Sequence, residues 1–243
     1  WHVAYVRQVN RFGSPGSMKV WEALYDELHG ARDLSPKPAL LGISRGGLYV
    51  NAWTRLHPDR VSVLYLDNGV CDIRSWPGGF QLERKGKGSP NDWKLYKAEF
   101  GFADDAAALE RSVRPEAGFA AAIKAGVTLI SCHGTADQVV PHEDNAAKVV
   151  AFWKQAGGRV VLFPKEGGDH HPHGLPDPKP LIEAIAANAG CACVGDTWAT
   201  PRSVTRTSAP DVSSTRRSSA STRASPTPPP CAASPPSADW SRT

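Results

Sequence analysis

A chain of 243 residues is long enough for one large domain, and a hydrophobic content of 41% supplies enough apolar side chains for a core. The formal net charge of +4 comes entirely from the segment after residue 196, which contains six arginines and two aspartates. Residues 1–196 are therefore neutral and show no electrostatic sign of a nucleic-acid partner. No run of about eighteen apolar residues exists, so the sequence predicts no membrane-spanning helix.

Strands and helices are predicted to alternate along residues 1–188. Short apolar runs predict strands, and apolar residues spaced three and four apart predict amphipathic helices. In chain order the sequence predicts a strand at 2–6, a helix at 17–30, strand 38–43, helix 46–58, strand 61–70, a polar stretch at 71–91, helices within 92–125, strand 126–134, helix 143–158, strand 159–168 and helix 177–190. This alternation is typical of βαβ units, so the predicted fold class is α/β, with a mostly parallel sheet flanked by helices.

The composition changes sharply after Gly190. More than half of residues 197–243 are Ser, Thr or Pro, and such a segment cannot bury enough apolar surface to offset its ordering entropy. We expect a folded domain over 1–190, with a lid-like insertion at about 71–125, and a low-complexity tail over 191–243. The tail is interpreted as a disordered linker or stalk, as a basic arm, or as out-of-frame translation of GC-rich DNA, which its abrupt start favours.

The five cysteines show no metal-binding pattern. Cys191 and Cys193 stand too close together for the usual C-x2-C knuckle. Cys71 and Cys132 lie in apolar strand-like runs, where buried free thiols are expected. The first residues have neither the basic start nor the long apolar stretch of a secretory signal, and the sequence assigns no compartment.

Ser44 stands in the segment ALLGISRGGLYVNAW, where a G-x-S-x-G pattern separates a predicted strand from a predicted helix. This is the context of a nucleophile elbow, in which flanking glycines allow a sharp turn that lifts the serine hydroxyl clear of the sheet. The N-terminus of the following helix favours developing negative charge, and the backbone N–H of Arg45 is the expected oxyanion donor.

A nucleophilic serine needs a base that is itself oriented by an acid. Asp137 follows the predicted strand 126–134, and His170, His171 and His173 follow the predicted strand 159–168. The order Ser, Asp, His, each at the carboxyl end of a strand, predicts a catalytic triad. Three histidines so close together could also bind a metal such as zinc, but they lack helical i, i+4 spacing, so neither a metal site nor a cofactor is predicted.

Three segments together resemble the elbow, acid loop and histidine loop of α/β-hydrolase-fold serine esterases: GISRGG, HGTADQVVP and GGDHHPHGLPDP. More narrowly, they resemble bacterial hydrolases found beside carbohydrate-active enzymes, and NRFGSPGSM and VCDIRSWPGG resemble further segments of that group. The resemblance covers about residues 1–188. It implies a domain truncated at its N-terminus, which begins at the fourth of eight strands and lacks the loop with the second oxyanion N–H. Residues 2–6 would then pair beside strand 38–43, or that sheet edge would stay open.

Carried over by position, the resemblance implies that Ser44 attacks an ester carbonyl, that His170 transfers the proton and that Asp137 fixes the imidazole tautomer. His171 stays an alternative base, because the family commonly has Gly where this chain has Asp169.

The insertion holds two further candidates. Asp72, just after a predicted strand, is the alternative triad acid. Trp76, followed by Pro-Gly-Gly, either stacks against a sugar or aromatic group of the substrate or packs beneath a Gly-rich loop.

The predicted function is hydrolysis of small or carbohydrate-linked carboxylic esters through an acyl-enzyme, with no nucleic-acid or membrane partner and an unassigned oligomeric state. A non-catalytic binding module of the same fold is the alternative. Peptidases, lactonases and thioesterases use the same triad, and the fold does not choose among them.

Overall fold

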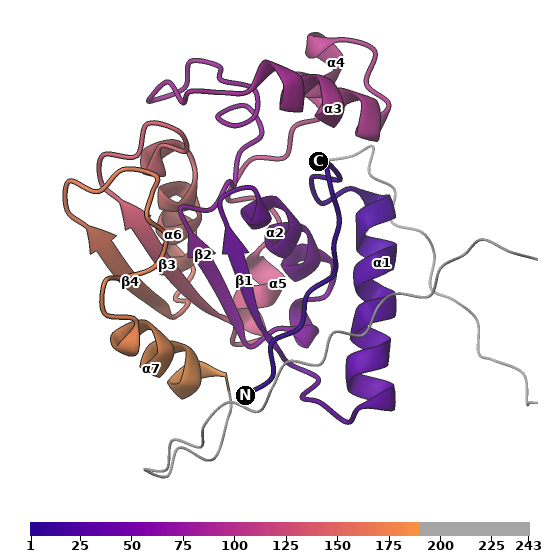
Figure 1. Ribbon diagram of the computed structural model, residues 1–243, viewed down its shortest axis with the longest axis vertical. Coiled ribbons are helices and arrows are strands. Elements are labelled where there is room, and N and C mark those ends of the chain that lie inside the picture. Colours follow the sequence, from indigo (N-terminus) through magenta and orange to yellow (C-terminus); the bar gives the residue numbers. More distant parts are fainter. Residues whose placement is uncertain (190–243) are drawn as a thin grey trace, which may run out of the picture. The chain divides into compact units, whose positions relative to one another are not determined.

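A parallel sheet of four strands lies at the centre of the computed structural model, which describes residues 1–189 (Figure 1). The strands are β1 (Ala39–Ile43), β2 (Val63–Asp67), β3 (Thr128–Gly134) and β4 (Val160–Lys165), in the order β1-β2-β3-β4. All three pairings are parallel, so the carboxyl ends of the strands meet at one edge of the sheet. This arrangement confirms the predicted α/β class.

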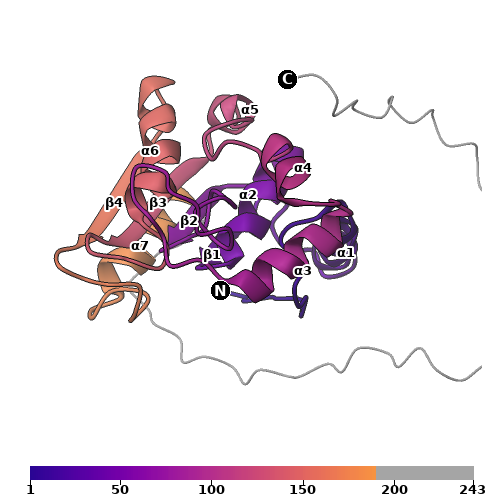
Figure 2. The same cartoon turned by 90° about the horizontal axis from the view of Figure 1, so that it is seen from above.

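Helices cover both faces of the sheet (Figures 1 and 2). Side chains alternate along β2, so Leu64 and Leu66 join the core with α2 and α6, whereas Val63 and Tyr65 pack with Leu181 of α7. The helices after strands β1, β3 and β4 are α2 (Gly46–Leu56), α6 (Ala146–Gln155) and α7 (Lys179–Asn188), and short helical turns occur at η1 (Glu27–Ala31), η2 (Pro58–Arg60) and η3 (His142–Asp144).

Helix α1 (Pro15–Asp26) precedes the sheet and packs on α2. Its first turn is capped by Ser14, whose hydroxyl oxygen accepts a hydrogen bond from the Ser17 N–H, and proline occupies the first helical position. Trp21 of α1 lies 5.8 Å from Trp53 of α2, ring centre to ring centre. The face packed toward the core holds Met18, Trp21 and Tyr25. Val20, on the apolar face from which the helix was predicted, is instead 41% exposed.

The insertion between β2 and β3 is irregular up to Ser89 and then forms α3 (Pro90–Phe100), α4 (Asp105–Glu110) and α5 (Ala120–Lys124). Ser89 caps α3, and Gly101 ends it with a φ of 71°, a value that suits glycine. Helices α3 and α4 lie beyond the carboxyl ends of the strands (Figure 1). This part of the insertion therefore lies at the same end of the sheet as the predicted triad, whereas α5 contacts α2 and η2.

The strand predicted at residues 2–6 is wrong, because that segment forms no strand in the structure. An extended segment becomes a strand only when a neighbour takes its backbone hydrogen bonds, and β1 does not pair with it. Of the two expected arrangements the open edge is found: within residues 1–189, β1 is an edge strand, and Leu41 and Ile43 are 54% and 41% exposed.

Two further expectations concern the C-terminal tail and membrane-spanning helices. The predicted tail over 191–243, with Cys191 and Cys193, lies outside the described residues. Among the helices that are described, none has the length and hydropathy needed to cross a bilayer.

Candidate active site

Ser44 occupies a strained turn between β1 and α2. Its φ of 48° lies in the left-handed region, which costs a non-glycine residue about 1–2 kcal/mol. Hydrogen bonds hold the turn: the Ser44 N–H donates to the Asp67 carbonyl at 3.0 Å, and the Ser44 carbonyl accepts from Gly47 and Val70 at 3.0 and 2.8 Å. A strained serine held in this way matches the predicted nucleophile elbow.

Close packing explains two of the glycines around this turn. A Cβ on Gly47 would lie 2.4 Å from the carbonyl oxygen of Val70, and one on Gly42 would lie 2.4 Å from Val50 Cγ2. A Cβ on Gly46 would meet nothing within 4 Å. The contacts that fix the turn therefore involve Gly42 and Gly47, although Gly46 completes the G-x-S-x-G pattern.

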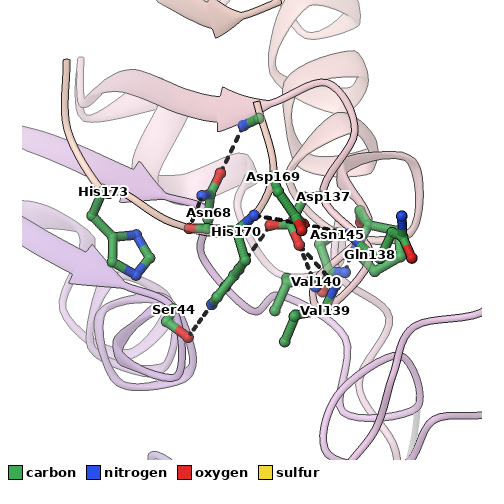
Figure 3. A network of polar contacts seen from close by, with 12 residues as sticks. Ser44, Asn68, Asp137, Gln138, Val139, Val140, Asn145, Asp169, His170 and His173 are labelled. Atoms are coloured by element: carbon green, nitrogen blue, oxygen red, sulfur yellow. Dashed lines mark hydrogen bonds and ion pairs between the residues drawn. The ribbon is translucent and has the colours of Figure 1, made fainter. Parts of the chain in front are cut away.

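The three predicted triad residues form one hydrogen-bonded chain (Figure 3). Ser44 Oγ lies 2.9 Å from His170 Nε2, and His170 Nδ1 lies 2.8 Å from Asp137 Oδ2. The side chains come from the loops after β1, β4 and β3, three strands whose carboxyl ends lie at one edge of the sheet. His170 and Asp137 are buried, whereas Ser44 is partly exposed and accessible to a substrate.

The second carboxylate oxygen of Asp137 is held by the backbone. Asp137 Oδ1 accepts hydrogen bonds from the N–H groups of Val139 and Val140 at 2.9 and 2.8 Å. These bonds fix the carboxylate in the orientation that reaches His170, which selects the tautomer with its proton on Nδ1 and leaves Nε2 to accept the serine proton.

Asn68 and Asp169 position the histidine loop, and sequence reasoning assigned neither of them a role. Asn68 Nδ2 donates to the His170 carbonyl at 2.7 Å, and its Oδ1 accepts from the Gly134 N–H at 2.8 Å. Asp169 Oδ1 accepts from the N–H groups of His170 and Gln138, which lowers the pKa of this carboxyl. A polar residue directly after a buried strand was the available signal for Asn68.

Asp67, buried at the end of β2, anchors the far side of the histidine loop. Its carboxylate accepts hydrogen bonds from the Gly174 N–H at 2.6 Å and from the Tyr65 hydroxyl at 2.9 Å. His173 Nδ1 lies 3.4 Å from the same carboxylate. Burial lowers the pKa of His173, and Asp67 partly opposes that shift.

The backbone N–H of Arg45 is placed as the predicted oxyanion donor. Arg45 directly follows Ser44 at the N-terminus of α2, and its N–H has no hydrogen-bond acceptor among residues 1–189. The Arg45 side chain has another role, since it donates to Asn10 Oδ1 at 2.9 Å and to Asp92 Oδ1 at 2.8 Å. It thereby ties the elbow to the N-terminal segment and to α3.

Trp76 does not form the open stacking platform that was one of its two predicted roles. Its side chain is only 9% exposed and belongs to the core. The Arg45 guanidinium lies 4.8 Å from its ring centre, as in a cation–π contact. Its burial favours the alternative prediction of a packing role.

The alternative triad residues are also placed elsewhere. The carboxylate of Asp72 is buried and accepts hydrogen bonds from the backbone and side chain of Arg74, both at 2.9 Å, so it serves as an ion-pair partner and not as the triad acid. His171 is exposed, and the base position next to Ser44 is occupied by His170.

A second pair of histidines lies beside the acid loop. His133 of β3 and His142 of η3 stack face to face, with ring centres 3.5 Å apart and planes within 2°. Burial lowers the pKa of both imidazoles, and that of His142 falls to about 4 because His133 adds to the effect. Both rings are therefore neutral at pH 7.

Comparisons with known proteins establish the fold. No family model and no curated protein matches this chain. A Mycobacterium tuberculosis puromycin-hydrolyzing peptidase aligns with a TM-score of 0.53 at 16% identity, over 76% of this chain and 27% of its own. The uncomplexed Pyrococcus horikoshii acylaminoacyl peptidase aligns with a TM-score of 0.51 at 15% identity, over 78% of this chain and 30% of its own.

At these identities the likeness shows the fold alone, which is the α/β-hydrolase fold. This chain spans less than a third of the length of either peptidase. The chemistry must therefore be argued from the site itself.

Proposed function

We propose that this chain carries the catalytic centre of a serine hydrolase that cleaves carboxylic esters. The observation that carries the proposal is the chain of contacts from Ser44 Oγ to His170 Nε2 and from His170 Nδ1 to Asp137 Oδ2, at 2.9 and 2.8 Å. A binding protein has no need of a nucleophile, base and acid in hydrogen-bonding distance, so this geometry favours catalysis over the non-catalytic alternative.

In the first half of the reaction Ser44 Oγ attacks the ester carbonyl carbon while His170 Nε2 takes the hydroxyl proton. The carbonyl oxygen becomes an oxyanion near the Arg45 N–H, and Asp137 stabilises the imidazolium. The ester C–O bond then breaks, His170 gives its proton to the leaving alcohol, and the acyl group stays on Ser44.

In the second half a water molecule replaces the alcohol. His170 takes a proton from the water as its oxygen attacks the acyl carbon, and a second oxyanion forms at the same N–H. The bond to Ser44 Oγ breaks, Ser44 recovers the proton from His170, and the carboxylic acid leaves.

The rate depends on how many donors face the oxyanion. Within residues 1–189 we assign one such donor, the Arg45 N–H. Loss of one of two donors typically lowers kcat by about 10²–10³-fold. We therefore expect slow but Ser44-dependent turnover, which an activated ester with a good leaving group reveals best.

Esters of small acids or of carbohydrates are the proposed substrates, because the elbow, acid-loop and histidine-loop segments resemble those of esterases. Peptide bonds are the second candidate, because the matching structures carry the names of peptidases. Both reactions use the same triad and differ in the leaving group, an alcohol or an amine.

Three substrates separate the candidates: p-nitrophenyl acetate, an acetylated xylo-oligosaccharide and an aminoacyl p-nitroanilide. We expect hydrolysis of the esters above that of the anilide, and a loss of at least about 10⁴-fold in Ser44→Ala. Preferential cleavage of the anilide would support the peptidase. Equal rates for the wild type and Ser44→Ala would contradict both.

A further inference from the structure

Three imidazole rings converge in the histidine loop. One ring nitrogen from each of His170, His171 and His173 lies within 4.8 Å of the other two. The ring centres are 4.7 to 5.1 Å apart, and the rings meet edge to face. The loop spacing of these residues did not predict a metal site, but the fold brings their donor atoms into one cluster.

Two of the three rings have a buried carboxylate behind them. His170 Nδ1 lies 2.8 Å from Asp137, and His173 Nδ1 lies 3.4 Å from Asp67. A carboxylate on one ring nitrogen orients a histidine and raises its basicity, which is the usual arrangement behind a metal-ligating imidazole. In both rings Nε2 is the nitrogen left for a ligand.

His171 supplies the adjustable member of the cluster. Its ring is exposed and makes no hydrogen bond with any residue in the range 1–189. Figure 3 shows the His173 ring beside the Ser44–His170 pair. Tetrahedral zinc with bonds of about 2.0–2.1 Å holds its ligand nitrogens about 3.3 Å apart, so the rings must draw together by rotation, mainly of His171.

We propose that His170, His171 and His173 form an inhibitory Zn²⁺ site. Zinc fits three imidazoles because some zinc sites bind the metal through three neutral histidines and leave the fourth position open. The carboxylates of Asp137 and Asp67 offset the charge of the cation, although Lys165 Nζ, 4.0 Å from Asp67, opposes it in part.

Zinc bound at this site would block catalysis, because it would use the lone pair of His170 Nε2. His170 Nε2 is the atom that faces Ser44 Oγ at 2.9 Å, and it cannot bind zinc and accept the serine proton at the same time. Bound zinc therefore switches off the nucleophile. The metal site itself does not depend on the proposed function, whereas its inhibitory effect rests on it.

The binding test titrates the full-length protein with Zn²⁺ in competition with a chromophoric chelator. We expect one tight site in the wild type, with affinity at least about 10-fold weaker in His171→Gln and in His173→Gln. His29→Gln is the matched control, because His29 is also exposed but lies on η1 outside the cluster, and its affinity should equal that of the wild type. Wild-type stoichiometry and affinity in His171→Gln would overturn the site.

The inhibition test measures labelling of Ser44 by a fluorophosphonate, with and without Zn²⁺, as a ratio for each variant. Zinc should slow labelling of the wild type, EDTA should restore it, and His171→Gln should require at least about 10-fold more zinc for the same effect. Equal labelling of zinc-loaded and zinc-free protein would overturn the inhibitory role.

The two proposals fail in different ways. If zinc binding depends on His171 but Ser44 never reacts with the fluorophosphonate, the hydrolase proposal is wrong and the metal site is supported. If Ser44 reacts with the fluorophosphonate but zinc binding does not depend on His171, the metal site is wrong and the hydrolase proposal is supported.

Discussion

The triad loops and helices α3 and α4 of the insertion lie at the same end of the sheet but are held in different ways (Figure 1). The triad side chains follow β1, β3 and β4, and short hydrogen bonds to neighbouring backbone groups fix them. Helix α3 of the insertion is held mainly by side chains: Tyr96 meets Phe12 edge to face, with ring centres 5.8 Å apart. Trp93 lies between Phe80 and Tyr96, at 5.3 and 5.4 Å between ring centres.

Ion pairs complete the attachment of the insertion. Asp92 of α3 binds Arg45 at 2.8 Å, and Glu99 binds Arg11 at 3.0 Å. The strand ends together with hydrogen bonds from Asn68 and Asp169 place the triad, whereas helix α3 depends on packing and charge. Changes in the triad loops should therefore remove activity from a folded protein, and changes in the insertion should mainly lower stability.

The largest contrast is expected between two buried aspartates. Asp137→Asn should lower kcat/KM for an activated ester by about 10⁴-fold, because the amide favours the wrong His170 tautomer. Asp72→Asn breaks the buried side of an ion pair with Arg74 and should lower the free energy of unfolding by about 2–3 kcal/mol. The folded fraction of Asp72→Asn should have a kcat/KM within a few-fold of the wild-type value.

Ester kinetics and urea unfolding on both aspartate variants check this contrast. A large loss of kcat/KM in folded Asp72→Asn, with Asp137→Asn unaffected, would show that the two acids have been assigned the wrong way round.

Two adjacent glycines test how the elbow is packed. Gly47→Ala forces a Cβ against the Val70 carbonyl, 2.4 Å away, and should lower the free energy of unfolding by about 2–3 kcal/mol. Gly46→Ala has open space, and the change should stay within about 0.5 kcal/mol. Urea denaturation of the two variants measures the difference, and equal stability would contradict the packing described for Gly47.

Asn68 and Asn145 form a second matched pair. Asn68→Ala leaves the His170 carbonyl and the Gly134 N–H without their partner, which should cost about 1–3 kcal/mol of stability. Because His170 then shifts, kcat/KM should also fall by about 10–100-fold.

Asn145 instead holds the start of the insertion, through hydrogen bonds from Cys71 N and Asp72 N. Asn145→Ala should lose comparable stability with a much smaller change in kcat/KM. If both variants lose activity equally, Asn68 has no special role in positioning the base.

The smallest predicted effect is a pH dependence of stability from the stacked histidines. The pKa of His142 is about 4 in the folded protein and near 6.5 when unfolded, so the unfolded state binds the extra proton between these values. The contribution of His142 to the free energy of unfolding is fully present above pH 6.5. It should fall by about 2 kcal/mol as the pH drops to 4. Urea midpoints across this range should decline less steeply in His142→Gln, and parallel profiles would contradict the assignment.

Strands β1 to β4 and the positions of Ser44, Asp137 and His170 at their carboxyl ends could be predicted from the sequence because each depends on a local pattern. Ser44 lies between an apolar run and an amphipathic helix, and Asp137 and His170 each follow an apolar run. In a parallel sheet those positions meet at one edge whatever the rest of the chain does. The strand ends bring the three residues to the same edge, and hydrogen bonds from Asn68 and Asp169 to the histidine loop complete the contacts.

The remaining features depend on contacts between distant segments. The role of Trp76 is decided by Arg45, thirty-one positions away, whose guanidinium covers the ring. Residues 2–6 have strand-like side chains, but they do not pair with the open edge of β1 and so form no strand. From the sequence Asn68 looks like an ordinary turn residue. Only the structure gives its role, through its two hydrogen bonds to β3 and the histidine loop.

Labelling by a fluorophosphonate, followed by peptide mapping, tests the central claim most directly. The probe reacts with an activated serine and not with ordinary hydroxyls, so it should label Ser44 in the wild type and fail to label His170→Ala, which keeps the serine and lacks the base. Absence of labelling in a folded wild type, or equal labelling of His170→Ala, would contradict the account of Ser44 as a nucleophile activated by His170.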